Sequence, residues 1–145
     1  MDNTSNIEKS NQLNTIIFYA LFAGQAIFLI IASYLLKTSG PINPDLSSAF
    51  QIILPVFTIG AVAGSMFVPK IILGSIADLS DDQKIIKYRA SLIVKWAMLE
   101  GANLFSIVIY LLTGSMLALG ISILILILFI LNKPTKDKMK EDLGL

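Results

Sequence analysis

The chain has 145 residues, of which 55% are hydrophobic and 14% charged, against roughly 25% charged in an ordinary soluble domain. This composition excludes a small water-soluble fold, whose large surface needs many polar residues, and a net charge of +1 gives no basic surface for nucleic acid. The sequence contains no histidine and no cysteine, so we expect no enzyme activity, no catalytic residue, no metal site and no cofactor.

The first apolar segment follows a polar N-terminal stretch. Residues 1–14 are rich in Asn, Ser and Gln, which predicts a solvated cytoplasmic tail ahead of a membrane domain at 15–132. The run from 15 to 36 predicts a helix of about 33 Å, close to the hydrocarbon thickness of a bilayer. Gln25 lies inside this run, and we expect its side chain to bond to a neighbouring helix.

The second helix is expected over residues 51–77. Its apolar part contains Pro55 and Pro69, and each proline removes a backbone hydrogen bond and favours a kink. We expect the last residues of this helix to continue beyond the bilayer into water.

Glycines are expected at helix contacts. Gly60 and Gly64 form a G-x-x-x-G pattern, which lets a neighbouring helix approach closely. We assign the same packing role to Gly24 in the first helix and to Gly101 in the third.

The third and fourth helices are expected over residues 81–113 and 116–132. Ser80 and Gln83 have the spacing of a capping box, which would satisfy free N–H groups at the start of the third helix. Trp96 suits the membrane interface, where an amphipathic ring lies at headgroup level.

Basic residues are concentrated on one side of the predicted helices. The connection between the second and third helices and its flanks carry Lys70, Lys84, Lys87, Arg89 and Lys95. The charged tail at 133–145 adds four lysines, whereas the opposite side has Lys37 alone. Positive residues stay in the cytoplasm, so we expect both termini there and the protein in the bacterial inner membrane.

These segments together predict an all-α fold. It is a four-helix transmembrane bundle in which the helices at 51–77 and 81–113 form a long hairpin that extends into the cytoplasm. The lipid bilayer is then the first partner of the chain.

Glu100 is the one acid inside an apolar run. An ionisable residue at the centre of a membrane helix costs about 2.5–3.5 kcal/mol, unless it takes up a proton or finds a partner. Asn103 lies one turn away on the same face, and Thr58 and Gln25 are candidate partners from other helices. Two interpretations remain open: a structural polar contact or interface anchor, and a group linked to proton, ion or substrate movement.

A longer set of residues resembles a family of small, uncharacterised bacterial membrane proteins. The resemblance covers most of the chain after residue 50 and is carried by Lys95-Trp96-Ala97-Met98-Leu99-Glu100-Gly101, Tyr110-Leu111-Leu112-Thr113-Gly114 and Leu131-Asn132-Lys133-Pro134. It implies four membrane spans and no established activity, so it assigns no functional residue.

A second, partial resemblance is to the proton-translocating c subunits of rotary ATPases. Over residues 54–113 the chain has glycines in one helix, a polar loop with Arg89, and a carboxylate followed by a small residue at Glu100-Gly101. The resemblance implies that Glu100 would carry the proton. The chain departs from that family in its sparse glycines, in the two prolines of the second helix and in its longer loop.

The sequence therefore favours a small multi-pass membrane protein with a non-catalytic structural or partner role. Its expected partners are a second copy of the chain or another membrane protein. The alternative is a proton- or cation-coupled channel, transporter or rotor element that uses Glu100.

Overall fold

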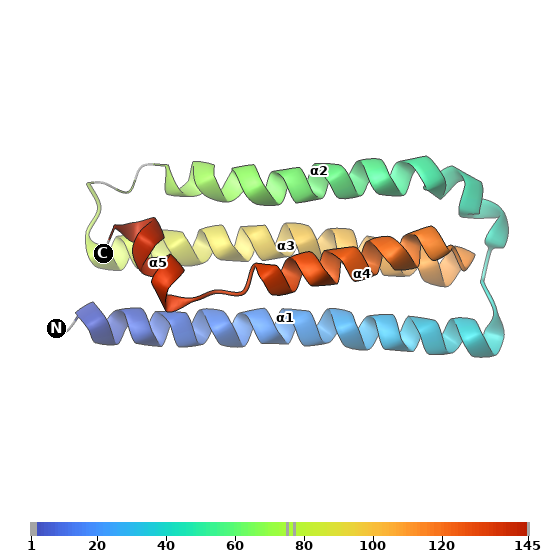
Figure 1. The fold of residues 1–145 in the computed structure, drawn as a ribbon, viewed down its shortest axis with the longest axis horizontal. Helices are drawn as coiled ribbons and strands as arrows, with labels where there is room; N and C mark the ends of the chain where they lie inside the picture. The colour runs from blue at the N-terminus through green and yellow to red at the C-terminus, as the bar shows by residue number, and fades with distance from the viewer. Residues whose placement is uncertain (1–2, 75, 77, 145) are drawn as a thin grey trace.

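The computed structural model describes residues 3–74, 76 and 78–144, with side chains from residue 6 onward, and the chain is helical with no strand over these residues (Figure 1). The elements in chain order are α1 (Asn3–Ser39), η1 (Pro44–Leu46), α2 (Ser47–Leu73), α3 (Asp81–Thr113), α4 (Met116–Leu131) and α5 (Lys136–Leu143). The all-helical prediction is thus confirmed for the part of the chain that is described.

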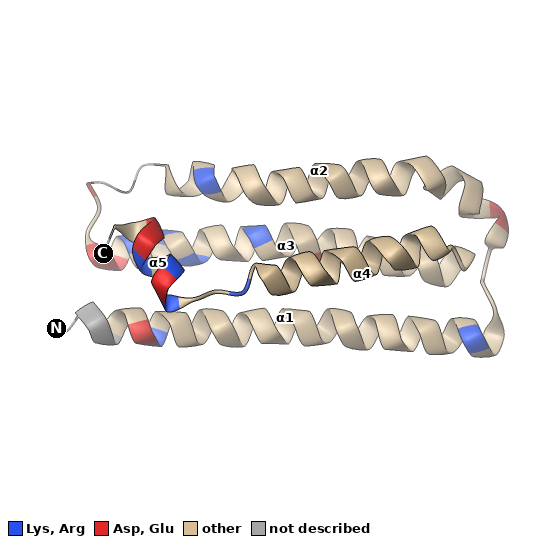
Figure 2. Ribbon diagram, viewed as in Figure 1, with Lys and Arg blue, Asp and Glu red and all other residues tan. Residues whose placement is uncertain are grey.

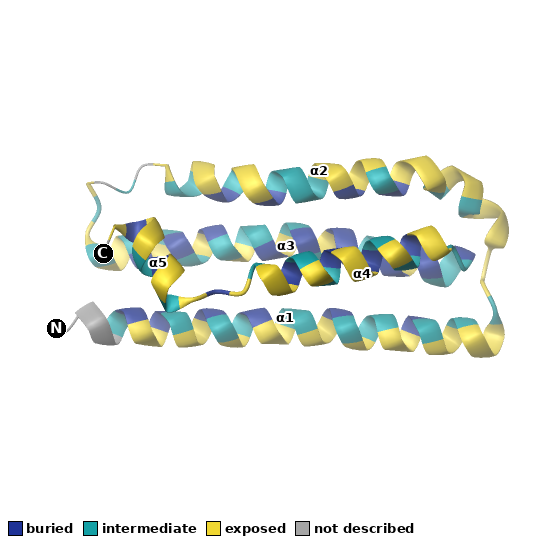
Figure 3. Ribbon diagram, viewed as in Figure 1, coloured by how far each residue is buried: buried dark blue, intermediate teal, exposed yellow. Residues whose placement is uncertain are grey.

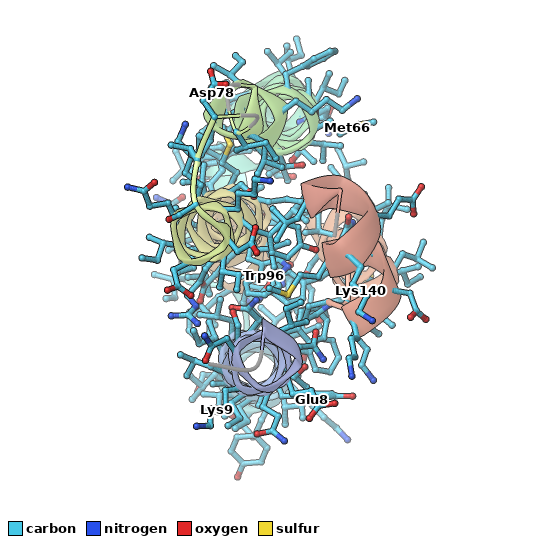
Figure 4. The ribbon with its side chains drawn as sticks, turned by 90° about the vertical axis from the view of Figure 1, so that its left-hand side faces the viewer. Glu8, Lys9, Met66, Asp78, Trp96 and Lys140 are labelled. Atoms are coloured by element: carbon cyan, nitrogen blue, oxygen red, sulfur yellow. The ribbon has the colours of Figure 1, made fainter. Side chains whose placement is uncertain are left out.

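Helix α3 is the centre of the bundle. It packs against α1, α2 and α4, and α4 in turn contacts both α1 and α2. An end-on view places α1 and α2 on opposite sides of α3, with α5 covering the end of α4 (Figure 4). Any residue of α3 therefore faces α1, α2, α4 or the one open side.

Both ends of α3 are stabilised by local sequence. The Ser80 hydroxyl accepts from the Gln83 backbone N–H at 3.5 Å, and the Gln83 side chain accepts from the Ser80 N–H at 3.2 Å, so the predicted capping box is present. At the other end Gly114 adopts a φ of +68°, a left-handed conformation that favours glycine.

The N-terminal segment differs from the sequence prediction. Residues 1–14 were expected as a solvated tail, but α1 already begins at Asn3 and buries Ile7, Ser10 and Asn14. These residues recur every three or four positions, in line with Phe18, so they form one face of a helix that α3 covers.

The C-terminal segment differs in the same way. Instead of a solvated tail at 133–145, the chain forms α5, whose Met139 and Leu143 are buried against Ile7, Ile85 and Tyr88. Two apolar residues four apart are enough for one short helix to cover this end of the bundle.

Helix α2 is shifted relative to the prediction of 51–77. It starts at Ser47 and ends at Leu73, where Gly74 follows as its cap. Ile76 is not helical, and Ala77 lies outside the described residues. The helix runs through both Pro55 and Pro69 without ending.

Three helices, α1, α2 and α3, are each long and apolar enough to cross a membrane. Helix α4 meets the same test only together with α5, from which it is bent by 73°. Apolar side chains face outward on the long helices, including Ile30 and Ile59, each 68% exposed. Exposed residues accordingly follow the outer edges of α1 and α2 (Figure 3).

Charged residues gather toward the end of the bundle where both chain termini lie (Figure 2). The middle of the long helices is almost free of charge in the same view. This distribution and the outward apolar faces are compatible with a membrane protein.

Trp96 lies in the largest apolar cluster instead of on the outer surface expected for an interface residue. Its ring is fully buried and packs edge-on against Phe18 of α1, which in turn stacks on Phe129 of α4. The indole Nε1–H donates to the Asn132 carbonyl at 3.3 Å, which satisfies its one polar atom.

Candidate functional site

Three polar side chains meet in the interior of the bundle. The Asn103 Nδ2 group of α3 donates to Gln25 Oε1 of α1 at 2.8 Å, and the Ser122 hydroxyl of α4 donates to Asn103 Oδ1 at 2.7 Å. All three residues are fully buried. We call Gln25, Asn103 and Ser122 the polar triad.

The backbone of α1 also forms a hydrogen bond with the polar triad. Gln25 Nε2 donates to the Leu21 carbonyl at 3.2 Å, so every triad residue takes part in at least one hydrogen bond. Its members are uncharged amides and a hydroxyl, which can align three helices but cannot store a proton at neutral pH. Chemically, the triad is suited to fixing helix register.

Glu100 lies beside the polar triad but does not join it. The sequence suggested a bond from Asn103 to Glu100, whereas the Asn103 amide bonds to Gln25 and Ser122. Glu100 is half-buried, and its carboxylate forms no hydrogen bond or ion pair within the described residues. Its neighbours Ala97 and Gly101 are exposed, so Glu100 lies near the open side of α3.

Thr58 is also separate from Glu100. The side of α3 that faces α2 carries Met98 and Phe105, which contact Gly64 and Phe57. Glu100 is two residues from Met98, which turns it about 200° around the helix and away from α2. The Thr58 hydroxyl is buried without a hydrogen-bond partner in the described part of the chain.

The four glycines assigned to helix packing have different surroundings. A Cβ at Gly64 would meet the flexible end of the Met98 side chain, so this glycine lies at the α2–α3 contact and its packing role stays a prediction. A Cβ at Gly24, Gly60 or Gly101 would meet no described atom within 4 Å. Within one chain these three do not mediate packing, which corrects the expectation from the sequence.

A second polar contact lies nearer the charged end. Arg89 of α3 donates from Nε to Asn14 Oδ1 at 3.2 Å and from Nη2 to the Ser10 hydroxyl at 3.0 Å. The sequence indicates Arg89 as a topology signal and as part of the polar loop in the c-subunit resemblance, but not as a residue that contacts α1. No local pattern links it to partners that lie 75 and 79 residues earlier.

Ser122 was the other residue that sequence reasoning missed. In the sequence, Ser122 and Gly120 interrupt the apolar run from 116 to 131. A hydroxyl on an otherwise apolar helix was the available signal, since such side chains bond across helices. Its partner could not be read from the sequence.

No family model, curated protein or solved structure matches this chain with significant similarity. The comparisons therefore add no support to the two resemblances noted from the sequence. Among the described residues, no group of three or more potential metal ligands comes together.

Proposed function

We propose that this chain is a small multi-pass protein of the bacterial inner membrane, with a structural or partner role and no catalysis of its own. In this proposal four helices cross the bilayer, and the α2–α3 hairpin extends into the cytoplasm with both termini. The observation that carries it is the combination of outward-facing apolar side chains with charges gathered at one end of the bundle (Figures 2 and 3).

The interior supports a structural role over a catalytic one. Several of its buried polar side chains bond between helices, as in the polar triad and in the Ser106 hydroxyl, which donates to the Ala118 carbonyl at 2.7 Å. The partner in the membrane would be a second copy or another helical protein, for which the open faces at Gly60 and Gly101 leave room.

The topology can be tested by labelling introduced cysteines, because the natural sequence has none. K9C, T38C, S115C and D142C would be treated with a membrane-impermeant maleimide in intact cells and after permeabilisation. We expect Thr38 and Ser115 positions to label from outside, and Lys9 and Asp142 positions only after permeabilisation. The reverse pattern, or a protein that stays folded in water without detergent, would overturn the proposal.

A second function is favoured by one observation. Glu100 is half-buried in an otherwise apolar stretch, and no described side chain bonds to its carboxylate. A carboxylate that serves only as a structural contact would have a partner, whereas one that exchanges protons or cations needs a free group. The alternative is therefore a proton- or cation-coupled role for Glu100.

Carbodiimide labelling separates the two functions. A protonated Glu100 inside a bilayer should react faster than Glu141 of α5 and should lose that reactivity at high pH, with E100Q as the unlabelled control. Equal labelling at Glu100 and Glu141 would exclude the coupled role and leave the structural one.

A further inference from the structure

A cavity of about 200 Å³ lies between α2, α3 and the segment from the end of α4 into α5. Its charged lining residues are Lys70, Lys95, Lys133, Lys138 and Asp142. Basic segments of α2, α3 and the α4–α5 connection lie toward the same end of the bundle in Figure 2. We call this cavity the lysine pocket.

The charges of the lysine pocket are not balanced. The lining includes four lysines and one carboxylate, that of Asp142, which gives it a formal charge of +3; the Lys133 ammonium itself lies over the Tyr19 ring of α1. None of these lysines pairs with a carboxylate within 4.0 Å in the described residues. Lys133 contacts the Tyr19 ring at 5.2 Å, which leaves its charge uncompensated.

The pocket also holds a buried hydroxyl that lacks a partner. Tyr88 lines the cavity and is 1% exposed, and its phenolic oxygen has no hydrogen-bond partner in the described part of the chain. A buried hydroxyl without a hydrogen-bond partner carries an energetic cost. An acceptor placed in the cavity would remove that cost.

Two further hydroxyls limit what the ligand can be. Ser65 donates to the Val62 carbonyl at 2.7 Å, and Ser91 donates to the Tyr88 carbonyl at the same distance. Their protons are thus already used, so the donors left for a ligand are the ammonium groups, the Tyr88 phenol and the second amide hydrogen of Asn132, whose first bonds to the Leu128 carbonyl. A ligand that matches this set is an anion with several acceptor oxygens.

We propose that the lysine pocket binds a phosphate group, either that of an anionic phospholipid headgroup or a free phosphate. Lysine is a common phosphate ligand as a point charge, and a tetrahedral group with several oxygens can reach ammonium groups from different helices together with the phenol. Met66 and Leu73 line the same cavity, which gives the start of a lipid chain an apolar surface.

The two possible sources of the phosphate group, a lipid headgroup and free phosphate, depend on different premises. The phosphate chemistry follows from the pocket alone. The lipid source rests on the proposed membrane location, because basic pockets between helices on the cytoplasmic side suit anionic headgroups. The experiment therefore has one arm for each source.

In the first arm, the full chain in detergent micelles is titrated with phosphatidylglycerol or phosphatidylcholine, and its melting temperature and lipid binding are followed. In the second arm, inorganic phosphate replaces the lipid. Saturable binding of phosphatidylglycerol alone assigns the headgroup, and saturable binding of inorganic phosphate assigns a free ligand. Lack of saturable binding in both arms overturns the proposal.

Single substitutions of residues that line the lysine pocket test whether the ligand binds there. K95Q, K138Q and Y88F should each weaken binding about fivefold or more, the equivalent of about 1 kcal/mol per contact. K84Q is the matched control, because Lys84 lies on α3 but does not line the pocket. Lys70 is exposed, so K70Q should fold normally and still weaken binding. Equal affinity in K70Q, K84Q and the natural chain would place the ligand elsewhere and overturn the assignment.

Discussion

The Asn103 amide of α3 donates a 2.8 Å hydrogen bond to Gln25 Oε1 of α1, across 78 residues of sequence. Because Ser122 donates to the same Asn103 side chain, one residue joins three helices at one level of the bundle. In an apolar bundle such a contact aligns helices that apolar packing alone would let slide.

Replacing Asn103 by leucine should destabilise the bundle by about 1–3 kcal/mol, because Gln25 Oε1 and the Ser122 hydroxyl lose their buried partner. The measurement is reversible unfolding in detergent micelles. V108A on the exposed side of α3 is the control and should change stability by less than about 0.5 kcal/mol.

The double variant N103L/Q25L should lose less unfolding free energy than the sum of the losses in the two single variants. Strict additivity would show that the bond is not energetically coupled.

Replacing Arg89 by glutamine should free the N-terminal turns of α1. The guanidinium reaches Asn14 and Ser10 together, and hydrogen bonds to a charged group contribute about 1.5–3 kcal/mol. Amide hydrogen exchange over residues 6–14 should therefore accelerate about tenfold or more, with little change in the rest of α1. K84Q is the control for loss of a positive charge on α3. Equal exchange in the two variants would contradict a tethering role for Arg89.

Truncating Met139 to alanine should release α5. Its side chain is 1% exposed and packs with Ile85 and Tyr88, and the loss of such a core contact costs about 2–5 kcal/mol. A helix of this length has little stability of its own, so trypsin should cleave after Lys138 and Lys140 faster than in the natural chain. M116A, at a side chain that is 71% exposed, should leave that rate unchanged. Unchanged cleavage in M139A would show that α5 is not held by this contact.

The single tryptophan reports directly on the apolar core. Trp96 is fully buried, so lipids with brominated chains should quench its fluorescence weakly. A W96F/I59W variant places the indole where the natural side chain is 68% exposed, and the same lipids should quench it strongly. If both proteins were quenched equally, the Trp96 ring would be exposed to lipid and not enclosed in the apolar core.

Sequence reasoning was most successful where the signal is local. The capping box at Ser80 and Gln83 depends on residues three apart, and α3 spans the same residues, 81–113, that the sequence predicts. It was wrong about the segments at 1–14 and 133–145, which have too few apolar residues to indicate helices by themselves. Within the described residues, 3–14 and 136–143 are helical because each segment buries one narrow face against the other and against α3.

The candidate site shows the same difference between what local sequence signals indicate and what tertiary contacts decide. The sequence identified Gln25 and Asn103 as polar residues in apolar helices, and it identified Glu100 as the acid that needs explaining. It could not tell which of them meet. The two amides bond to each other, while Glu100, one turn from Asn103, lies on a different edge of α3.

Composition and apolar run length by themselves determined that the chain is helical and apolar enough to belong in a membrane, because both properties are sums over local residues. Tertiary structure alone decided that Asn103 bonds Gln25 and Ser122, that Trp96 is enclosed, and that lysines from three segments share one cavity. The physical reason is that these contacts depend on the rotation and register of whole helices. A turn of 100° per residue moves a side chain from one neighbour to another without changing the sequence pattern.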